Sequence, residues 1–123
     1  MRLKIKVTKD ILRKAMWCGT GKAPSPSLST NCAIALAVRD IFPHAQISNK
    51  ITTWVMVGRG EIDTIQLPIE AIEFIGWFDR LWRSPKKRLL MPELEFEIDV
   101  PDHIVEAINI SDIHKSPTLE VVV

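Results

Sequence analysis

Two segments far apart in the chain alternate charged and apolar residues one by one, a pattern typical of β-strands with one buried and one solvated face. Residues 2–7 alternate basic and apolar side chains, and residues 93–100 alternate acidic and apolar ones. Opposite charges that face each other across neighbouring strands are mildly stabilising. We therefore expect the two segments to lie side by side in one sheet, with the row of acids in a structural rather than a catalytic role.

Periodicity, caps and turn residues divide the rest of the chain into helices and strands. Apolar residues at helical spacing predict helices at residues 9–17, 32–42 and 68–83, and one or two helical turns at residues 102–109. Thr8 is the expected N-cap of the first helix. Strands are predicted at residues 45–48, 52–57 and 61–67, with a glycine-bearing hairpin turn between the last two.

These elements predict a single domain of the α+β class over residues 1–123. We expect a mostly antiparallel sheet of four to five strands with two or three helices packed on one face. On a helical wheel of residues 68–83, Trp82 falls on the apolar side and Trp77 on its boundary.

The tail, residues 111–123, ends in residues with strong strand propensity, among them Leu119, Val121 and Val123. An uncovered apolar strand edge tends to find a partner. The tail therefore either adds a strand to its own sheet or joins two copies of the chain in a homo-oligomer.

Composition narrows the class of protein. With 123 residues, 46% of them hydrophobic, the chain is large enough for one core without disulfides or metals. It has no apolar run of about 20 residues, and its first residues interleave charge with apolar side chains, unlike a signal peptide. We expect a cytoplasmic protein that does not bind membranes. In a reducing cytosol we expect Cys18 and Cys32 to be free thiols rather than bridged. They lack the paired spacing of a zinc site, and we expect no metal and no cofactor.

The net charge of +1 conceals a strong asymmetry. Residues 1–22 are mostly basic among their charged positions, and residues 92–123 are mostly acidic. Pairing of the two ends in one sheet explains this arrangement, which is the interpretation we favour. The alternative is a polar molecule that steers a charged partner.

The first candidate site is a basic cluster with one indole. It consists of Trp77, Arg80, Arg83, Lys86, Lys87 and Arg88. Arginine forks match phosphate or carboxylate, and an indole stacks on a base or a guanidinium. The cluster predicts binding of an anionic ligand, a nucleic acid or an acidic protein surface. The competing interpretation is structural, since cations at a helix C-terminus complement the helix dipole and a basic loop is readily solvated.

Two weaker candidates lie before the second helix. The segment Gly19-Thr20-Gly21-Lys22 lacks the glycine of a phosphate-binding P-loop, which would fall at Met16. An anion held by Lys22 and the helix start at Asn31 is less favoured than an ordinary surface loop. Cys32 near a helix N-terminus is a candidate nucleophile of a cysteine-dependent hydrolase, but none of the histidines forms a recognisable signature with it.

Several short blocks resemble one family of small uncharacterised proteins from phages, prophages and their bacterial hosts. They are Asn31–Asp40 with Phe42-Pro43, Leu67-Pro68, Ala71, Phe74-Ile75, Phe78-Asp79, Pro92 and Phe96. No activity comes with this family. The resemblance implies an accessory protein that works in the bacterial cytoplasm, and it leaves out the basic stretch 80–88 and the tail after Val100.

Three functions are therefore expected, in order. The first is a non-catalytic binding protein, such as a phage accessory or inhibitor protein. The second is the sequestration or sensing of a phosphorylated small molecule, such as a nucleotide, or of a nucleic acid at the basic cluster. The third is a hydrolase that uses Cys32.

Overall fold

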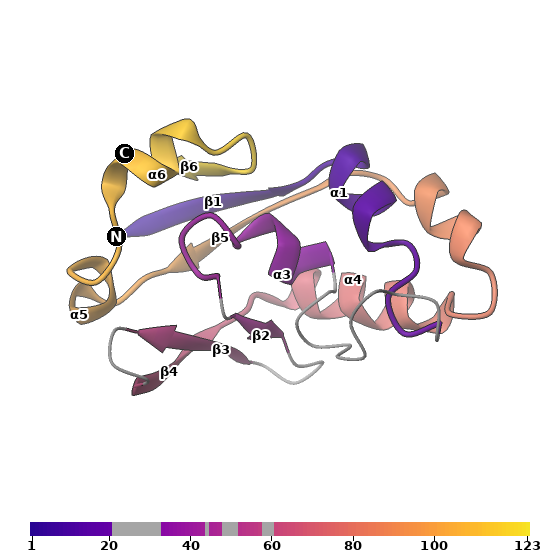
Figure 1. Cartoon of the computed structure of the whole chain (residues 1–123), viewed down its shortest axis with the longest axis horizontal. Helices are drawn as coiled ribbons and strands as arrows, with labels where there is room; N and C mark the ends of the chain where they lie inside the picture. Colours follow the sequence, from indigo (N-terminus) through magenta and orange to yellow (C-terminus); the bar gives the residue numbers. More distant parts are fainter. Residues whose placement is uncertain (21–32, 44, 48–51, 58–60) are drawn as a thin grey trace.

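A computed structural model of the chain describes residues 1–20, 33–43, 45–47, 52–57 and 61–123. Its elements follow in the order β1 (Arg2–Val7), α1 (Lys9–Ala15), α3 (Ala33–Ala37), β2 (Gln46–Ile47), β3 (Thr52–Val57), β4 (Glu61–Gln66), α4 (Ile69–Arg80), the 3-10 helix η1 (Pro85–Leu90), β5 (Leu94–Asp99), α5 (Asp102–Val105), α6 (Ile110–Lys115) and β6 (Leu119–Val121) (Figure 1). The α+β class is confirmed. The described strands form two antiparallel sheets of three strands each, rather than one sheet of four to five.

The first sheet has the strand order β5-β1-β6 and confirms the pairing of the two alternating segments. Its register places each base of β1 opposite an acid of β5: Arg2 opposite Asp99, Lys4 opposite Glu97 and Lys6 opposite Glu95. Glu120 of β6 lies on the other side of β1, 3.6 Å from Lys6 and 3.9 Å from Lys4 between the charged atoms. We call this solvated side of the sheet the charged face.

The tail completes its own sheet through β6. Leu3 pairs with Val121 and Ile5 with Leu119, which places the apolar residues of β6 on the core side. Leu119 is buried and Val121 is partly buried, whereas Val123 is fully exposed. Two of the three residues expected at an oligomer contact therefore pack within their own chain.

The second sheet has the strand order β2-β3-β4. β3 and β4 form the predicted hairpin, whose last pair is Val57 with Glu61. The predicted turn, residues 58–60, lies outside the described residues.

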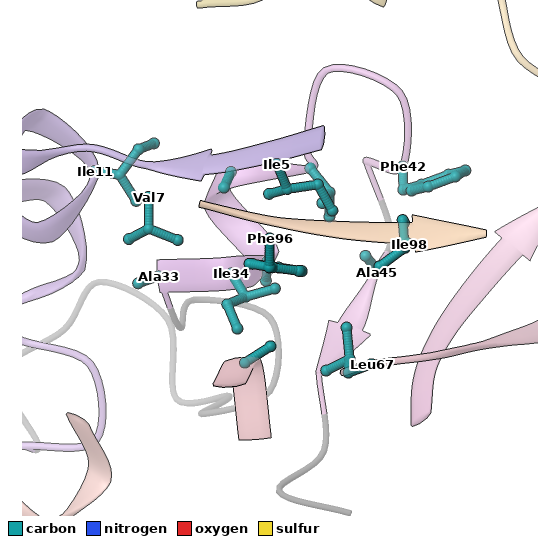
Figure 2. Packing of buried hydrophobic residues seen from close by; sticks show 14 of the residues in the cluster. Ile5, Val7, Ile11, Ala33, Ile34, Phe42, Ala45, Leu67, Phe96 and Ile98 are labelled. Atoms are coloured by element: carbon teal, nitrogen blue, oxygen red, sulfur yellow. The ribbon is translucent and has the colours of Figure 1, made fainter. Parts of the chain in front are cut away.

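The core lies between the apolar side of the first sheet and the helices. Leu3, Ile5 and Val7 of β1 are fully buried, and Phe96 and Ile98 of β5 lie beside them (Figure 2). Helix α3 lies against β1 and β2 (Figure 1). Its buried alanines at positions 33, 35 and 37 keep the helix thin, which lets it pack closely.

Helix boundaries differ from the prediction mainly at their C-terminal ends. Helix α1 begins after Thr8, whose side chain accepts a hydrogen bond from the backbone N–H of Ile11 as predicted. Helix α3 ends at Ala37 and continues as a turn through residue 41, so the described part of the predicted helix 32–42 is only partly helical. Helix α4 ends at Arg80, three residues early, and α6 begins at an unpredicted cap, Asn109.

Candidate functional site

Five of the six predicted site residues lie on the surface, where α4 ends and η1 begins. Trp77, Arg80, Arg83, Lys86 and Lys87 are all exposed, and Trp77 is 48% accessible. Trp82 joins them with 49% of its surface accessible, although the helical wheel placed it in the core. We call this set of six, Trp77, Arg80, Trp82, Arg83, Lys86 and Lys87, the basic tryptophan surface.

Helix α4 positions the first two members. Its apolar positions Ala71, Phe74, Ile75 and Phe78 are buried, which turns the opposite side of the helix to solvent. Trp77 and Arg80 are three residues apart and are therefore neighbours on the helix surface. The Nε of Arg80 donates to the carbonyl of Gly76 over 3.2 Å, so its side chain lies back along the helix.

The end of α4 explains the error at Trp82. Leu81 is the C-cap, with φ −88° and ψ 16°, and residues 81–83 form a turn. A helical wheel applies only while the helix continues, so it does not fix the direction of a side chain in this turn. The guanidinium of Arg83 lies over the ring of Trp82, 4.8 Å from its centroid, within the range of a cation–π contact.

The 3-10 helix η1 carries the remaining two lysines and is tied to α1. Lys86 and Lys87 are exposed on it. The Nζ of Lys9 donates to the carbonyls of Leu89 and Met91 at the end of η1. The backbone N–H of Lys9 also donates to the Glu93 carboxylate over 3.0 Å. Lys86 and Lys87 thus stand on an anchored segment rather than on an open loop.

Arg88 is not part of the exposed surface: it is 1% accessible, so the structure removes it from the predicted site. Its Nε donates to the carbonyl of Phe78 over 2.9 Å, and its Nη1 donates to the carbonyls of Met16 (2.9 Å) and Cys18 (2.6 Å). Its guanidinium carbon also lies 3.9 Å from the centroid of the Phe78 ring. Arg88 therefore joins the last turn of α4 to the segment after α1.

Burial and the charge of Arg88 set the pKa values around this junction. Burial lowers the pKa of the Arg88 guanidinium, against the effect of Cys18 and Asp79, but an arginine starts so high that it stays charged. Burial raises the pKa of the Cys18 thiol, and Arg88 opposes this shift. Desolvation also raises the pKa of the Asp79 carboxyl, again opposed by Arg88. A buried thiol with a raised pKa is a poor nucleophile at neutral pH.

Two other exposed apolar side chains were not singled out from the sequence. Trp17 is 36% accessible and Leu90 is 80% accessible. Trp17 stands between the two residues whose carbonyls Arg88 binds, so its backbone lies next to the junction with α4. No signal in the sequence indicates this proximity, because Met16 and Arg88 are 72 residues apart.

The other candidates give no described site. Lys22, Asn31 and Cys32 lie outside the described residues. Glu95, Glu97 and Asp99 lie on the charged face, where Arg2 contacts Asp99 (2.6 Å) and Glu97 (3.5 Å). Within the described part of the chain, no three His, Cys, Asp or Glu side chains gather closely enough to hold a metal ion.

Comparison of the chain with protein-family models, with curated proteins and with solved structures finds no match. In the described ranges, no helix has the length and apolar character needed to cross a membrane. The fold and the site together define a small α+β protein whose most distinctive surface combines half-exposed indoles with cations.

Proposed function

We propose that this protein is a non-catalytic binding protein that holds an anionic partner on the basic tryptophan surface. The observation that carries the proposal is the pair of half-exposed indoles, Trp77 and Trp82, beside four exposed cations. Large aromatic side chains are usually buried, and exposed tryptophan with arginine is enriched where proteins bind partners. Arginine and lysine give such a surface its preference for anions.

The resemblance to small phage and prophage proteins supports the setting of this proposal. It fits an accessory or inhibitor protein that acts in the bacterial cytoplasm. The proposal assigns no step of chemistry to the surface, because aromatic rings and cations are groups that bind and orient an anion.

Retention on immobilised heparin, a polyanion, tests the proposal. We expect the double variant R80A/R83A to elute at clearly lower salt than the unsubstituted protein, with little change in melting temperature because both side chains are exposed. The matched control is R13A/K14A, which also removes two exposed cations, here from α1. Equal losses of retention in both variants would show that only net charge matters and would refute the assignment to this surface.

A further inference from the structure

We infer that the partner of the basic tryptophan surface is single-stranded nucleic acid, with Trp77 and Trp82 stacking on bases and the four cations contacting phosphates. This inference rests on the proposed function and names its ligand. Base–aromatic stacking combined with a positively charged track is the usual way in which proteins bind single strands without strong sequence preference.

The two indoles favour a single strand over a duplex as the ligand. In a duplex the faces of the bases are already stacked on one another, so the rings of Trp77 and Trp82 would find only phosphates and groove edges. An unpaired strand exposes base faces that a ring can cover. Because each indole is about half accessible in the free protein, stacking would bury surface that the fold itself leaves in water.

The exposure of the six residues favours this partner over a small phosphorylated molecule. Small ligands are usually held in hollows with convergent polar groups. Hollows of about 420 and 270 Å³ lie between the charged face and the start of α4, and one of about 370 Å³ lies between α1 and α3. The residues that line these hollows include none of the six. The cations instead extend from α4 through the following turn to η1, an arrangement that suits a chain of successive phosphates.

The surface is also held in place before any ligand arrives. Arg88 ties η1 to α4 and to the segment after α1, and Lys9 binds the far end of η1. The four cations therefore stand on anchored backbone, which reduces the entropy lost when a strand binds.

Glu73 is an acid beside this surface, since it is exposed and lies four residues before Trp77 on the same side of α4. Its carboxylate would repel phosphates. The variant E73Q should therefore bind a single strand more tightly than the unsubstituted protein, whereas the loss of an acid far from the surface, in D112N on α6, should leave the affinity unchanged.

The test is a fluorescence titration with a fluorescein-labelled 20-nucleotide oligo-dT, compared with a 20-base-pair duplex, inorganic polyphosphate and polyglutamate. We expect the single strand to bind most tightly. W77A/W82A should weaken binding at least tenfold, with W77F/W82F retaining part of the affinity because a smaller ring still stacks. R80A/R83A should reduce the slope of log affinity against log salt by about 1.4, the value expected when two cations no longer neutralise phosphates of a single strand.

The outcomes separate the inference from the proposed function. If polyphosphate or polyglutamate binds as tightly as oligo-dT and the indole variants bind equally well, the surface holds anions but not single strands, and the inference falls alone. Duplex binding as tight as that of oligo-dT would also overturn it. If none of the four probes binds, both the inference and the proposed function fall.

Discussion

The role of Arg88 in the structure differs from the one that the sequence predicts. In the sequence it is the last of five cations between positions 80 and 88, and nothing distinguishes it from Lys87. In the structure it is buried and donates to three backbone carbonyls, two of them about 70 residues away. A run of basic residues is normally solvated, so only the tertiary arrangement of those carbonyls reveals the buried position.

Substitution of Arg88 should destabilise the fold. R88M leaves the carbonyls of Met16 and Cys18 without these donors, and we expect a loss of about 2–4 kcal/mol in the free energy of unfolding. R88K should lose less, about 1–2 kcal/mol, because an ammonium keeps the charge but cannot reproduce the planar fork. Urea denaturation measures both values. K87M, a change at an exposed neighbour, is the control, and equal stability of R88M and K87M would contradict the assigned role of Arg88.

At the scale of elements, strands were easier to predict than the ends of helices. β1 was predicted with its observed bounds, and β5 lies within the predicted acidic segment, because alternation has a period of two and each segment has one buried face. The N-terminal end of α1 followed from Thr8, since an N-cap has a local side-chain signature.

The C-terminal end of α4 has no such signature. Because the helix stops early, at Arg80, Trp82 is exposed. The cations and Trp77 of the surface were therefore predictable from local sequence, whereas Trp82 and the burial of Arg88 were not.

Helix α4 contains a glycine whose replacement should stabilise it. Gly76 lies inside the helix, where glycine costs about 0.5–1 kcal/mol relative to alanine. A Cβ at this position would meet the Nη2 of Arg80 at 3.6 Å, an ordinary van der Waals contact. We expect G76A to raise the free energy of unfolding by about 0.5–1 kcal/mol.

Thermal unfolding of G76A checks this expectation, together with the oligo-dT titration. The affinity for the strand should stay within about twofold, because the alanine methyl leaves room for Arg80. A lower melting temperature would mean that the contact with Arg80 is tighter than its geometry indicates.

For the whole molecule, the first sheet resolves the charge asymmetry of the sequence. The basic strand β1 lies between β5 and β6, so acids flank its bases on both sides. On the charged face three of the bases, Arg2, Lys4 and Lys6, meet four acids of β5 and β6, so the pairing that the pattern predicts neutralises part of the asymmetry. The cations of the basic tryptophan surface lie on α4, the turn after it and η1, outside this sheet, so its acids do not pair with them in the same way.

Reversal of one central charge tests this arrangement of the sheet. Lys4 stands opposite Glu97, and its Nζ lies 3.9 Å from a carboxylate oxygen of Glu120. K4E would place three acids side by side across the strands, and like charges directly opposite are destabilising. Because these side chains are partly solvated, we expect K4E to unfold about 0.5–1 kcal/mol more easily than the neutral control K4Q. The difference should shrink in 1 M NaCl, where the Debye length is only about 3 Å. A difference between K4E and K4Q that persists unchanged at high salt would contradict charge repulsion across the strands as its cause.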